Sequence, residues 1–253
     1  MDLPRLRFPN GAIALAALVL VGSVTAAQGN LITNGSFESF TAGGASGSCT
    51  TTQTVTNSNL PGWATTSGYS FDLNTGNYGS FCGPAGGLGL YGPIGASADG
   101  GNFLAGDGAY LTGYTYQILN GLVPGSNYIV AFQMAAAQQS GYTGATSDYW
   151  QVGLGATYGT GASQNSTTID LASGAFSGWV GQQISLVATA ATETLWFFAV
   201  GTPAGQPPFA LLDGVSVNVS EPSGAAVLAM GLLTLMWVRR ARPARKRRPR
   251  RRV

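Results

Sequence analysis

Residues 122–132 read Leu122-Val123-Pro124-Gly125-Ser126-Asn127-Tyr128-Ile129-Val130-Ala131-Phe132. The Pro-Gly pair predicts a turn, because proline fixes its own φ and glycine accepts a positive φ. The residues after the turn are β-branched or aromatic and mostly apolar on both faces. This pattern predicts a strand in the interior of a sheet that is covered on both sides.

The same alternation of short β-rich segments and glycine-containing turns recurs throughout residues 28–219, and no apolar run has a helical period. We therefore predict an all-β fold, an antiparallel jelly-roll β-sandwich. Residues 71–77 place oxygen-bearing side chains at alternate positions but lack the terminal Glu of an EF-hand, so a plain turn is expected there. The candidate strands are residues 30–33, 102–104, 109–118, 127–136, 149–154, 167–171, 179–187, 194–200 and 209–219.

The charges are divided unevenly along the chain. All 12 Lys and Arg residues lie at Arg5, Arg7 or beyond residue 238, and the chain has no His. The formal net charge of the whole chain is +2, but its central region, residues 28–219, contains acidic residues and no basic residue and is therefore negatively charged. Nucleic-acid binding is excluded for this region, because it requires basic residues that contact phosphates. Its acids are Glu38, Asp72, Asp99, Asp107, Asp148, Asp170, Glu193 and Asp213.

The same composition limits the possible enzyme chemistry. Without His or an internal Lys, the region cannot build a Ser-His-Asp triad or its lysine variant. Zinc sites lose their commonest ligand. A glycosidase with two carboxylates remains a chemical alternative, but the acids are scattered and mostly stand beside turn glycines. We therefore expect a non-catalytic protein.

Cys49 and Cys82 are the only cysteines of the chain. Two cysteines in an exported protein most often form a disulfide. The rival interpretation, a cysteine nucleophile, lacks a histidine to act as its base. We predict a Cys49–Cys82 bridge.

The first 27 residues are predicted to be a secretory signal peptide. Arg5 and Arg7 precede an apolar run at residues 12–21, and small residues follow at 24–26. This order is typical of a cleaved signal, with cleavage expected after Ala26 or Ala27. A retained membrane anchor is the alternative.

The last 34 residues divide into a short motif (220–223), an uncharged apolar span (224–238) and an arginine-rich tail (239–253). As a helix, the span would measure about 22 Å, less than the roughly 30 Å hydrocarbon core of a bilayer. Snorkelling arginines and the interfacial Trp237 can supply the missing length. We therefore predict a single transmembrane helix with a cytoplasmic C-terminus, and a buried core helix is the alternative.

The motif Ser220-Glu221-Pro222-Ser223, followed by the span and Arg239-Arg240, resembles the PEP-CTERM sorting signal of exported bacterial proteins. The chain departs from that pattern at Ser220, which replaces proline. The resemblance implies that an exosortase, a membrane transpeptidase, processes the protein near Glu221 and Pro222. It also implies an inner-membrane-anchored precursor, a mature protein at the cell surface or in the extracellular matrix, and exopolysaccharide as a partner.

The sandwich region resembles carbohydrate-binding modules and galactose-binding-like domains in three pieces: residues 31–38 (LITNGSFE), 60–63 (LPGW) and 211–217 (LLDGVSV). In many such modules the opening Glu and the closing Asp share a structural calcium ion. The resemblance therefore implies calcium at Glu38 and Asp213, with backbone carbonyls completing the ligands. The alternative is that Glu38 only caps the end of a strand.

Two functions of different classes remain. The first is a non-catalytic structural component of the envelope or of the exopolysaccharide matrix. The second is a carbohydrate-binding lectin module that stacks sugars on aromatic side chains. Trp63, Tyr69 and Tyr78 lie in loop-like sequence and are expected to be exposed, whereas Trp150 and Trp179 lie within predicted strands and are expected in the core.

Overall fold

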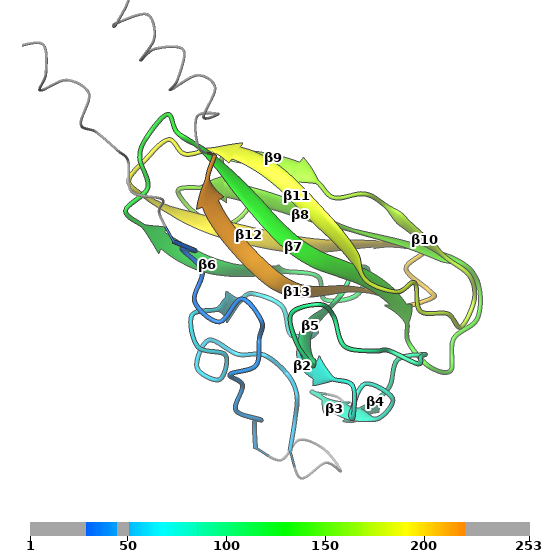
Figure 1. The fold of residues 1–253 in the computed structure, drawn as a ribbon. Coiled ribbons are helices and arrows are strands. Elements are labelled where there is room, and N and C mark those ends of the chain that lie inside the picture. The colour runs from blue at the N-terminus through cyan, green and yellow to red at the C-terminus, as the bar shows by residue number, and fades with distance from the viewer. Residues whose placement is uncertain (1–28, 45–50, 85, 221–253) are drawn as a thin grey trace, which may run out of the picture. The chain divides into compact units, whose positions relative to one another are not determined.

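The computed structural model describes residues 29–44, 51–84 and 86–220 (Figure 1). These residues belong to one compact unit, Gln28–Ser220. The predicted signal peptide, apolar span and basic tail lie outside the described residues, and their boundaries stay predictions. Among the described residues, no helix is both long and apolar enough to cross a bilayer.

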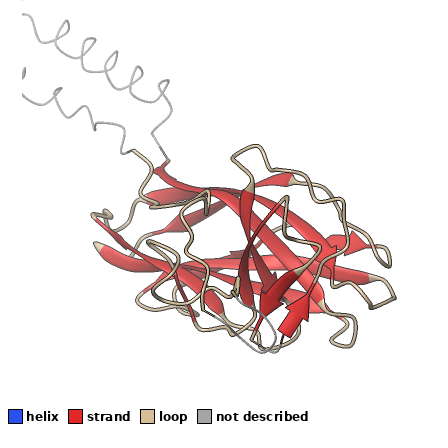
Figure 2. Cartoon of the chain, turned by 90° about the horizontal axis from the view of Figure 1, so that it is seen from below, coloured by secondary structure: helices blue, strands red, loops and turns tan. Residues whose placement is uncertain are grey.

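The compact unit is a sandwich of antiparallel strands with loops at their ends (Figure 2). One sheet has six strands, in the order β1-β6-β12-β8-β10, and β9 pairs with β8. Its strands are β1 (Ala64–Thr65), β6 (Tyr114–Asn120), β8 (Thr146–Gly155), β9 (Ala162–Asn165), β10 (Ile169–Leu171) and β12 (Thr192–Thr202).

The second sheet has five strands, in the order β11-β7-β13-β5-β2. They are β2 (Ser70–Asn74), β5 (Asn102–Asp107), β7 (Asn127–Gln138), β11 (Val180–Val187) and β13 (Pro208–Val219). A small hairpin of β3 (Phe81–Gly83) and β4 (Gly86–Leu88) stands apart from both sheets. The prediction of an all-β antiparallel sandwich is confirmed, and so is the interior position of the strand that follows the Pro-Gly turn.

The main hydrophobic core lies between the two sheets. Trp150 and Phe197 of the six-stranded sheet and Phe132 of the other sheet meet there in edge-to-face contacts. The indole N–H of Trp150 donates a hydrogen bond to the carbonyl of Leu211 at 3.0 Å, which ties the sheets together.

A second core covers the other side of the five-stranded sheet. Along β13, Ala210 and Leu212 belong to the main core, whereas Phe209 and Leu211 belong to the second. Phe81, Leu90 and Ile94, which come from the segment between β2 and β5, close this second core. Where the second core lies, the central strands of this sheet are therefore buried on both faces, whereas Ile129, Ala131 and Gln133 in the first part of β7 are partly exposed.

Two predicted strand segments are wrong. Residues 30–33 run beside β13 without forming a strand. The Asn30 side chain accepts the N–H of Val217 at 3.0 Å, in the place of a backbone carbonyl that would pair with it in a β-sheet. Residues 109–113 form a turn, because the Asp107 carboxylate accepts the N–H groups of Ala109 and Tyr110, each at 2.9 Å.

Residues 71–77 are not a plain turn as expected. Their first half belongs to β2, where Phe71 and Leu73 pack into the second core, and only residues 75–77 turn. The sequence analysis also missed β1, β3, β4 and β9, which are two to four residues long.

Candidate functional site

The outer face of the six-stranded sheet carries a group of aromatic side chains. Tyr114 and Tyr116 lie on β6, where they alternate with the buried Thr115 and Gln117. This alternation follows from the two-residue period of a strand, which sends every second side chain to the same face. We call the group the aromatic face; its members are Tyr114, Tyr116, Tyr149, Tyr158, Trp196 and Phe198.

The rings of the aromatic face contact one another across strands. The centroid of the Tyr158 ring lies 5.2 Å from that of Tyr114 and 5.0 Å from that of Tyr116. Tyr114 also lies 4.8 Å from Phe198 and 5.4 Å from Trp196. Each distance is within the range in which aromatic pairs attract beyond their burial.

Trp196 forms the base of this group. Its ring covers Gly153 of the neighbouring strand, where a Cβ atom would lie only 2.2 Å from the ring, so glycine is required there. Its indole N–H donates to the carbonyl of Thr160 at 3.0 Å, and the residue is buried. The tyrosines therefore form the accessible layer above it, and Tyr158 is 41% exposed.

This arrangement suits the binding of a sugar ring. A tyrosine offers an apolar ring face to the C–H groups of a sugar and a hydroxyl that both donates and accepts hydrogen bonds. Tyr149 and Gln151 of β8 are half-buried and extend the surface across the sheet. The aromatic face is thus a platform rather than an enclosed pocket.

The aromatic residues that the sequence suggested for binding lie elsewhere. Trp63 is 2% exposed, packs between Phe37 and Phe197, and donates its indole N–H to the carbonyl of Asn34. Tyr69 is 9% exposed. The expectation that these two side chains are exposed is wrong, because their loops fold back onto the sheets.

Tyr78 is half-buried against the second core, and so is Trp179, whose ring contacts Phe103. Trp150 is a core residue, as expected. None of these side chains belongs to the aromatic face.

A second aromatic concavity lies at the ends of β5 and β7. Its volume is about 390 Å³, and Tyr69, Tyr110, Tyr142, Asp107 and Gln139 are among its lining residues. Tyr110 and Tyr142 are 52% and 41% exposed. We call it the Tyr142 pocket.

Glu38 and Asp213, the predicted calcium ligands, lie in one acidic cluster, where protein groups donate hydrogen bonds to Oε1 of Glu38 and to both carboxylate oxygens of Asp213. Glu38 Oε1 accepts the N–H groups of Gly101 and Asn102, at 2.8 and 2.9 Å. Asp213 accepts the hydroxyl of Ser97 at 2.5 Å and the N–H of Gly214 at 2.7 Å. Glu38 therefore anchors the loop before β5, and calcium binding at Glu38 and Asp213 stays a prediction.

Asp72 is the member of this cluster that the sequence analysis missed. It is 2% exposed, and its Oδ2 has no hydrogen-bond partner. Burial, together with the nearby charges of Glu38 and Asp213, raises the pKa of Asp72 to about 8. Burial also raises the pKa of Asp213 to about 7.

The oxygen donors of this cluster are those that calcium prefers. Among the described residues, however, no three acidic, Cys or His side chains are grouped as a metal site would need. Carbonyl, hydroxyl or water oxygens would have to complete the ligands of any ion held by Asp72 and Asp213.

The sorting and disulfide residues lie mostly outside the described part of the chain. Ser220 ends it, with its N–H donating to the carbonyl of Asn127 at 2.8 Å, and Glu221 and Pro222 lie beyond. Cys82 lies in β3 and is not a free thiol. Its predicted partner Cys49 is outside the described residues, so the Cys49–Cys82 bridge stays a prediction.

Comparisons with known proteins give structural likeness only. No protein-family model matches the sequence, and no curated protein matches it. The solved structures of similar shape include TmCBM61 in complex with β-1,4-galactotriose, at a TM-score of 0.41 and 11% identity over 75% of this chain and 98% of that one. The CBM22-1 xylan-binding domain of Paenibacillus barcinonensis Xyn10C has a TM-score of 0.35 and 10% identity, over 68% and 93% of the two chains.

A Stig cyclase, Fisc from Fischerella sp. TAU, has a TM-score of 0.42 and 14% identity, over 78% of this chain and 99% of that one. A cyclase thus scores as high as the carbohydrate-binding modules. Likeness at this level does not distinguish among functions, which have to be argued from the site.

The residues of the aromatic face were absent from the sequence-based candidates. A signal for two of them was present in Tyr114-Thr115-Tyr116-Gln117, which alternates aromatic and polar residues as a strand with an exposed aromatic side would. Tyr158 gave no such signal, because only the fold brings its loop over β6.

Proposed function

We propose that this protein is an exported, non-catalytic carbohydrate-binding protein of the jelly-roll class, and that the aromatic face is its glycan-binding surface. The observation that carries the proposal is the layer of tyrosines on the outer face of the six-stranded sheet. Tyr158 is 41% exposed above the half-buried Tyr114 and Tyr116, and aromatic side chains that gather on an accessible face are candidates for binding. Part of the outer face of the five-stranded sheet is instead covered by the segment between β2 and β5, which closes the second core there.

The charge distribution favours a neutral glycan. Residues 28–219 contain no Lys, Arg or His, so no basic side chain in them is available to pair with a uronate or sulfate group. The acids of the same region would repel an anionic chain at low ionic strength. A neutral polysaccharide needs no basic partner and is not repelled by the acids, and it can bind to the ring faces and hydroxyl groups of the tyrosines.

Replacing Tyr158 with alanine is expected to weaken glycan binding at least about tenfold, which corresponds to about 1.4 kcal/mol. Tyr158 contacts both Tyr114 and Tyr116. Its loss therefore removes one ring on which a sugar can stack, and the other two rings lose the contact that holds them in position. The measurement is a glycan array of the full-length protein, followed by titration calorimetry with the best neutral ligand.

Tyr142→Ala is the matched control, because Tyr142 is equally exposed, at 41%, but lies in the other concavity. Loss of binding in Tyr142→Ala, with Tyr158→Ala unaffected, would move the site to the Tyr142 pocket. An array without any robust ligand would reject carbohydrate binding and leave the alternative, a structural component of the envelope or matrix.

We also propose that the C-terminal segment sorts the protein. The support is the order of its parts in the sequence: the motif at 220–223, the apolar span and the basic tail. Transfer of each basic residue through the bilayer centre costs about 2.5–3.5 kcal/mol, so the tail would stay in the cytoplasm. The motif would then stand at the outer surface of the inner membrane, within reach of an exosortase-like enzyme.

Replacing both Glu221 and Pro222 with alanine is expected to leave a longer, membrane-bound form in the native host. Proline holds the preceding residue in an extended conformation, as a bound substrate needs. Mass spectrometry of the wild-type surface protein should find a C-terminus between Ser220 and Pro222. Surface protein that keeps the whole tail through Val253 would instead indicate a simple single-span anchor.

For the acidic cluster of Glu38, Asp72 and Asp213 we propose a structural calcium ion, as the resemblance to carbohydrate-binding modules implied. The support is the buried and unpartnered Oδ2 of Asp72, together with the all-oxygen donor set. Asp213→Asn removes one carboxylate from this cluster and is expected to weaken calcium binding there.

A further inference from the structure

Asp148 is a buried acid near the start of β8, at the opposite end of this strand from the loop that carries Tyr158. Its side chain is fully buried, and neither carboxylate oxygen has a hydrogen-bond partner. It pairs with Gly201 of β12, where a Cβ atom would lie 2.8 Å from Asp148 Oδ1 and 2.4 Å from the ring of Pro208. The carboxylate therefore occupies the space that Gly201 leaves open.

The sequence offers this carboxylate no partner of opposite charge. No Lys, Arg or His occurs between residues 28 and 219. A buried carboxylate that is neither paired nor hydrogen-bonded costs several kcal/mol, so it must take up a proton or a bound cation. Burial, and then the charge of Asp107, raises the pKa of Asp148 to about 8.

Other buried side-chain oxygens also lack a hydrogen-bond partner. Six buried side-chain atoms in the described residues lack a partner; all are oxygens, and four of them belong to Thr146, Asp148 and Gln206. Thr146 lies two residues before Asp148 on β8 and is likewise buried. The Gln206 side chain packs against Gly144, at the start of the same segment.

We propose that this end of the sandwich holds a second divalent cation of the calcium class, with Asp148 as its anionic ligand. We call this the Asp148 site: Thr146, on the same face of β8, and Asp107, which precedes the Gly108 that is hydrogen-bonded to Gly201, are the candidate side-chain donors. Amide, carbonyl or water oxygens complete the ligands. Calcium accepts six to eight oxygens in flexible geometry, which suits a mixed set of carboxylate, hydroxyl and amide groups. Zinc is not expected, because the site has no Cys or His.

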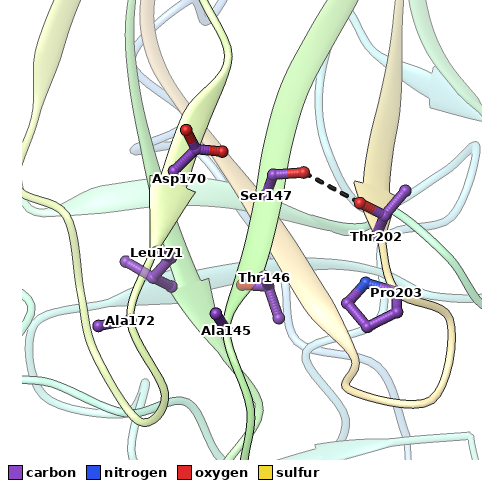
Figure 3. A pocket seen from close by; sticks show the side chains of 8 residues that line it. All are labelled: Ala145, Thr146, Ser147, Asp170, Leu171, Ala172, Thr202 and Pro203. Carbon is purple, nitrogen blue, oxygen red and sulfur yellow. Dashed lines mark hydrogen bonds between the residues drawn. The ribbon is translucent and has the colours of Figure 1, made fainter.

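An open pocket lies beside the start of β8. Its volume is about 420 Å³, and Thr146, Thr202 and Pro203 are among its lining residues (Figure 3). The hydroxyl groups of Ser147 and Thr202 form a hydrogen bond across it at 3.0 Å. Thr146 lines this pocket and shares its face of β8 with Asp148. Asp170 also lines the pocket, but it is exposed and pairs with the outward-facing Ser147.

The test compares calcium-dependent melting of four full-length proteins: wild type, Asp213→Asn, Asp148→Asn and the double variant. Each is freed of metal with EDTA, dialysed, and melted with and without CaCl₂ at constant ionic strength. A cation that binds only the folded state raises the melting temperature by mass action. We expect Asp213→Asn to keep a rise of several degrees and the double variant to lose it.

Equilibrium dialysis with radioactive calcium gives a second readout, in which Asp148→Asn should bind one ion fewer per chain than the wild type. Asp170→Asn is the matched control and should bind as many ions as the wild type. An unchanged calcium response in Asp148→Asn would overturn the proposal and leave Asp148 as a protonated acid. An equal response to MgCl₂ or NaCl at the same ionic strength would also overturn it, because simple screening of the acids then explains the rise.

Discussion

Replacing Trp150 with alanine is expected to lower the free energy of unfolding by about 3–5 kcal/mol, the usual cost of removing a large aromatic side chain from a core. Trp150 is 1% exposed and lies between the two sheets. Its ring contacts Phe197, and its indole N–H bonds to the carbonyl of Leu211 in the opposite sheet. The substitution therefore leaves a cavity and removes a hydrogen bond between the sheets at the same time.

Chemical denaturation of the wild type and two variants measures this effect. Trp150→Phe keeps most of the ring volume but loses the hydrogen bond, so it should cost clearly less than Trp150→Ala. Trp179→Ala is a second comparison, because Trp179 is only half-buried at the edge of the second core. A cost below about 1 kcal/mol for Trp150→Ala would contradict the central role of this residue in joining the sheets.

The sandwich was predictable from the sequence because its long strands satisfy simple rules. β7, β8, β11, β12 and β13 combine β-branched and aromatic residues with turns of proline and glycine, and the sequence analysis placed all of them. The prediction failed where side chains replace backbone hydrogen bonds, as Asn30 and Asp107 do. Such replacement depends on which strand lies opposite, and a single sequence does not show that.

The candidate site was less predictable than the fold. Loop-like sequence around Trp63 and Tyr69 indicated exposed aromatics, yet these residues are buried where their segments fold over the sheets. Conversely, the aromatic face combines strands β6, β8 and β12 with the Tyr158 loop. Neighbours in a sheet that are distant in the chain create this surface, so only the strand order reveals it.

The acids are a third case: the composition shows that they lack basic partners, but only the structure shows which of them are buried. The absence of bases from residues 28–219 already required the acids to be exposed, protonated or bound to cations. Asp170 and Glu38 are exposed, whereas Asp72 and Asp148 are buried with unpartnered oxygens. Sequence spacing did not separate these groups, because the residues flanking them are similar.

In the absence of divalent cations, the protein is expected to lose stability as the pH rises from about 4 to about 8. The pKa values of Asp72 and Asp148 are raised to about 8 in the folded state, chiefly by burial, whereas an unfolded aspartate titrates near 3.9. The folded state therefore binds more protons than the unfolded state across this range. Stability is full below the unfolded pKa and falls as the pH rises toward the folded pKa.

Each of the two acids contributes a slope of at most about 1.4 kcal/mol per pH unit, and Asp213, whose pKa is raised to about 7 by burial, adds to this slope below that pH. Glu38 and Asp213 face Asp72, and Asp107 faces Asp148, so the slope of each acid also depends on these neighbours. Thermal melting in EDTA at constant ionic strength, from pH 4.5 to pH 8.5, measures the trend.

Asparagine variants identify which carboxylates produce the slope. Asp148→Asn should reduce the slope by the share of this one carboxylate, because asparagine is neutral at every pH and fills the same space, and Asp170→Asn should leave it unchanged. Saturating calcium should reduce the fall in the wild type, since a bound cation replaces the proton as the neutralising charge. Stability that instead rises between pH 5 and pH 7 in EDTA would show that Asp72 and Asp148 ionise normally in the folded state, and the buried acids would then need no cation.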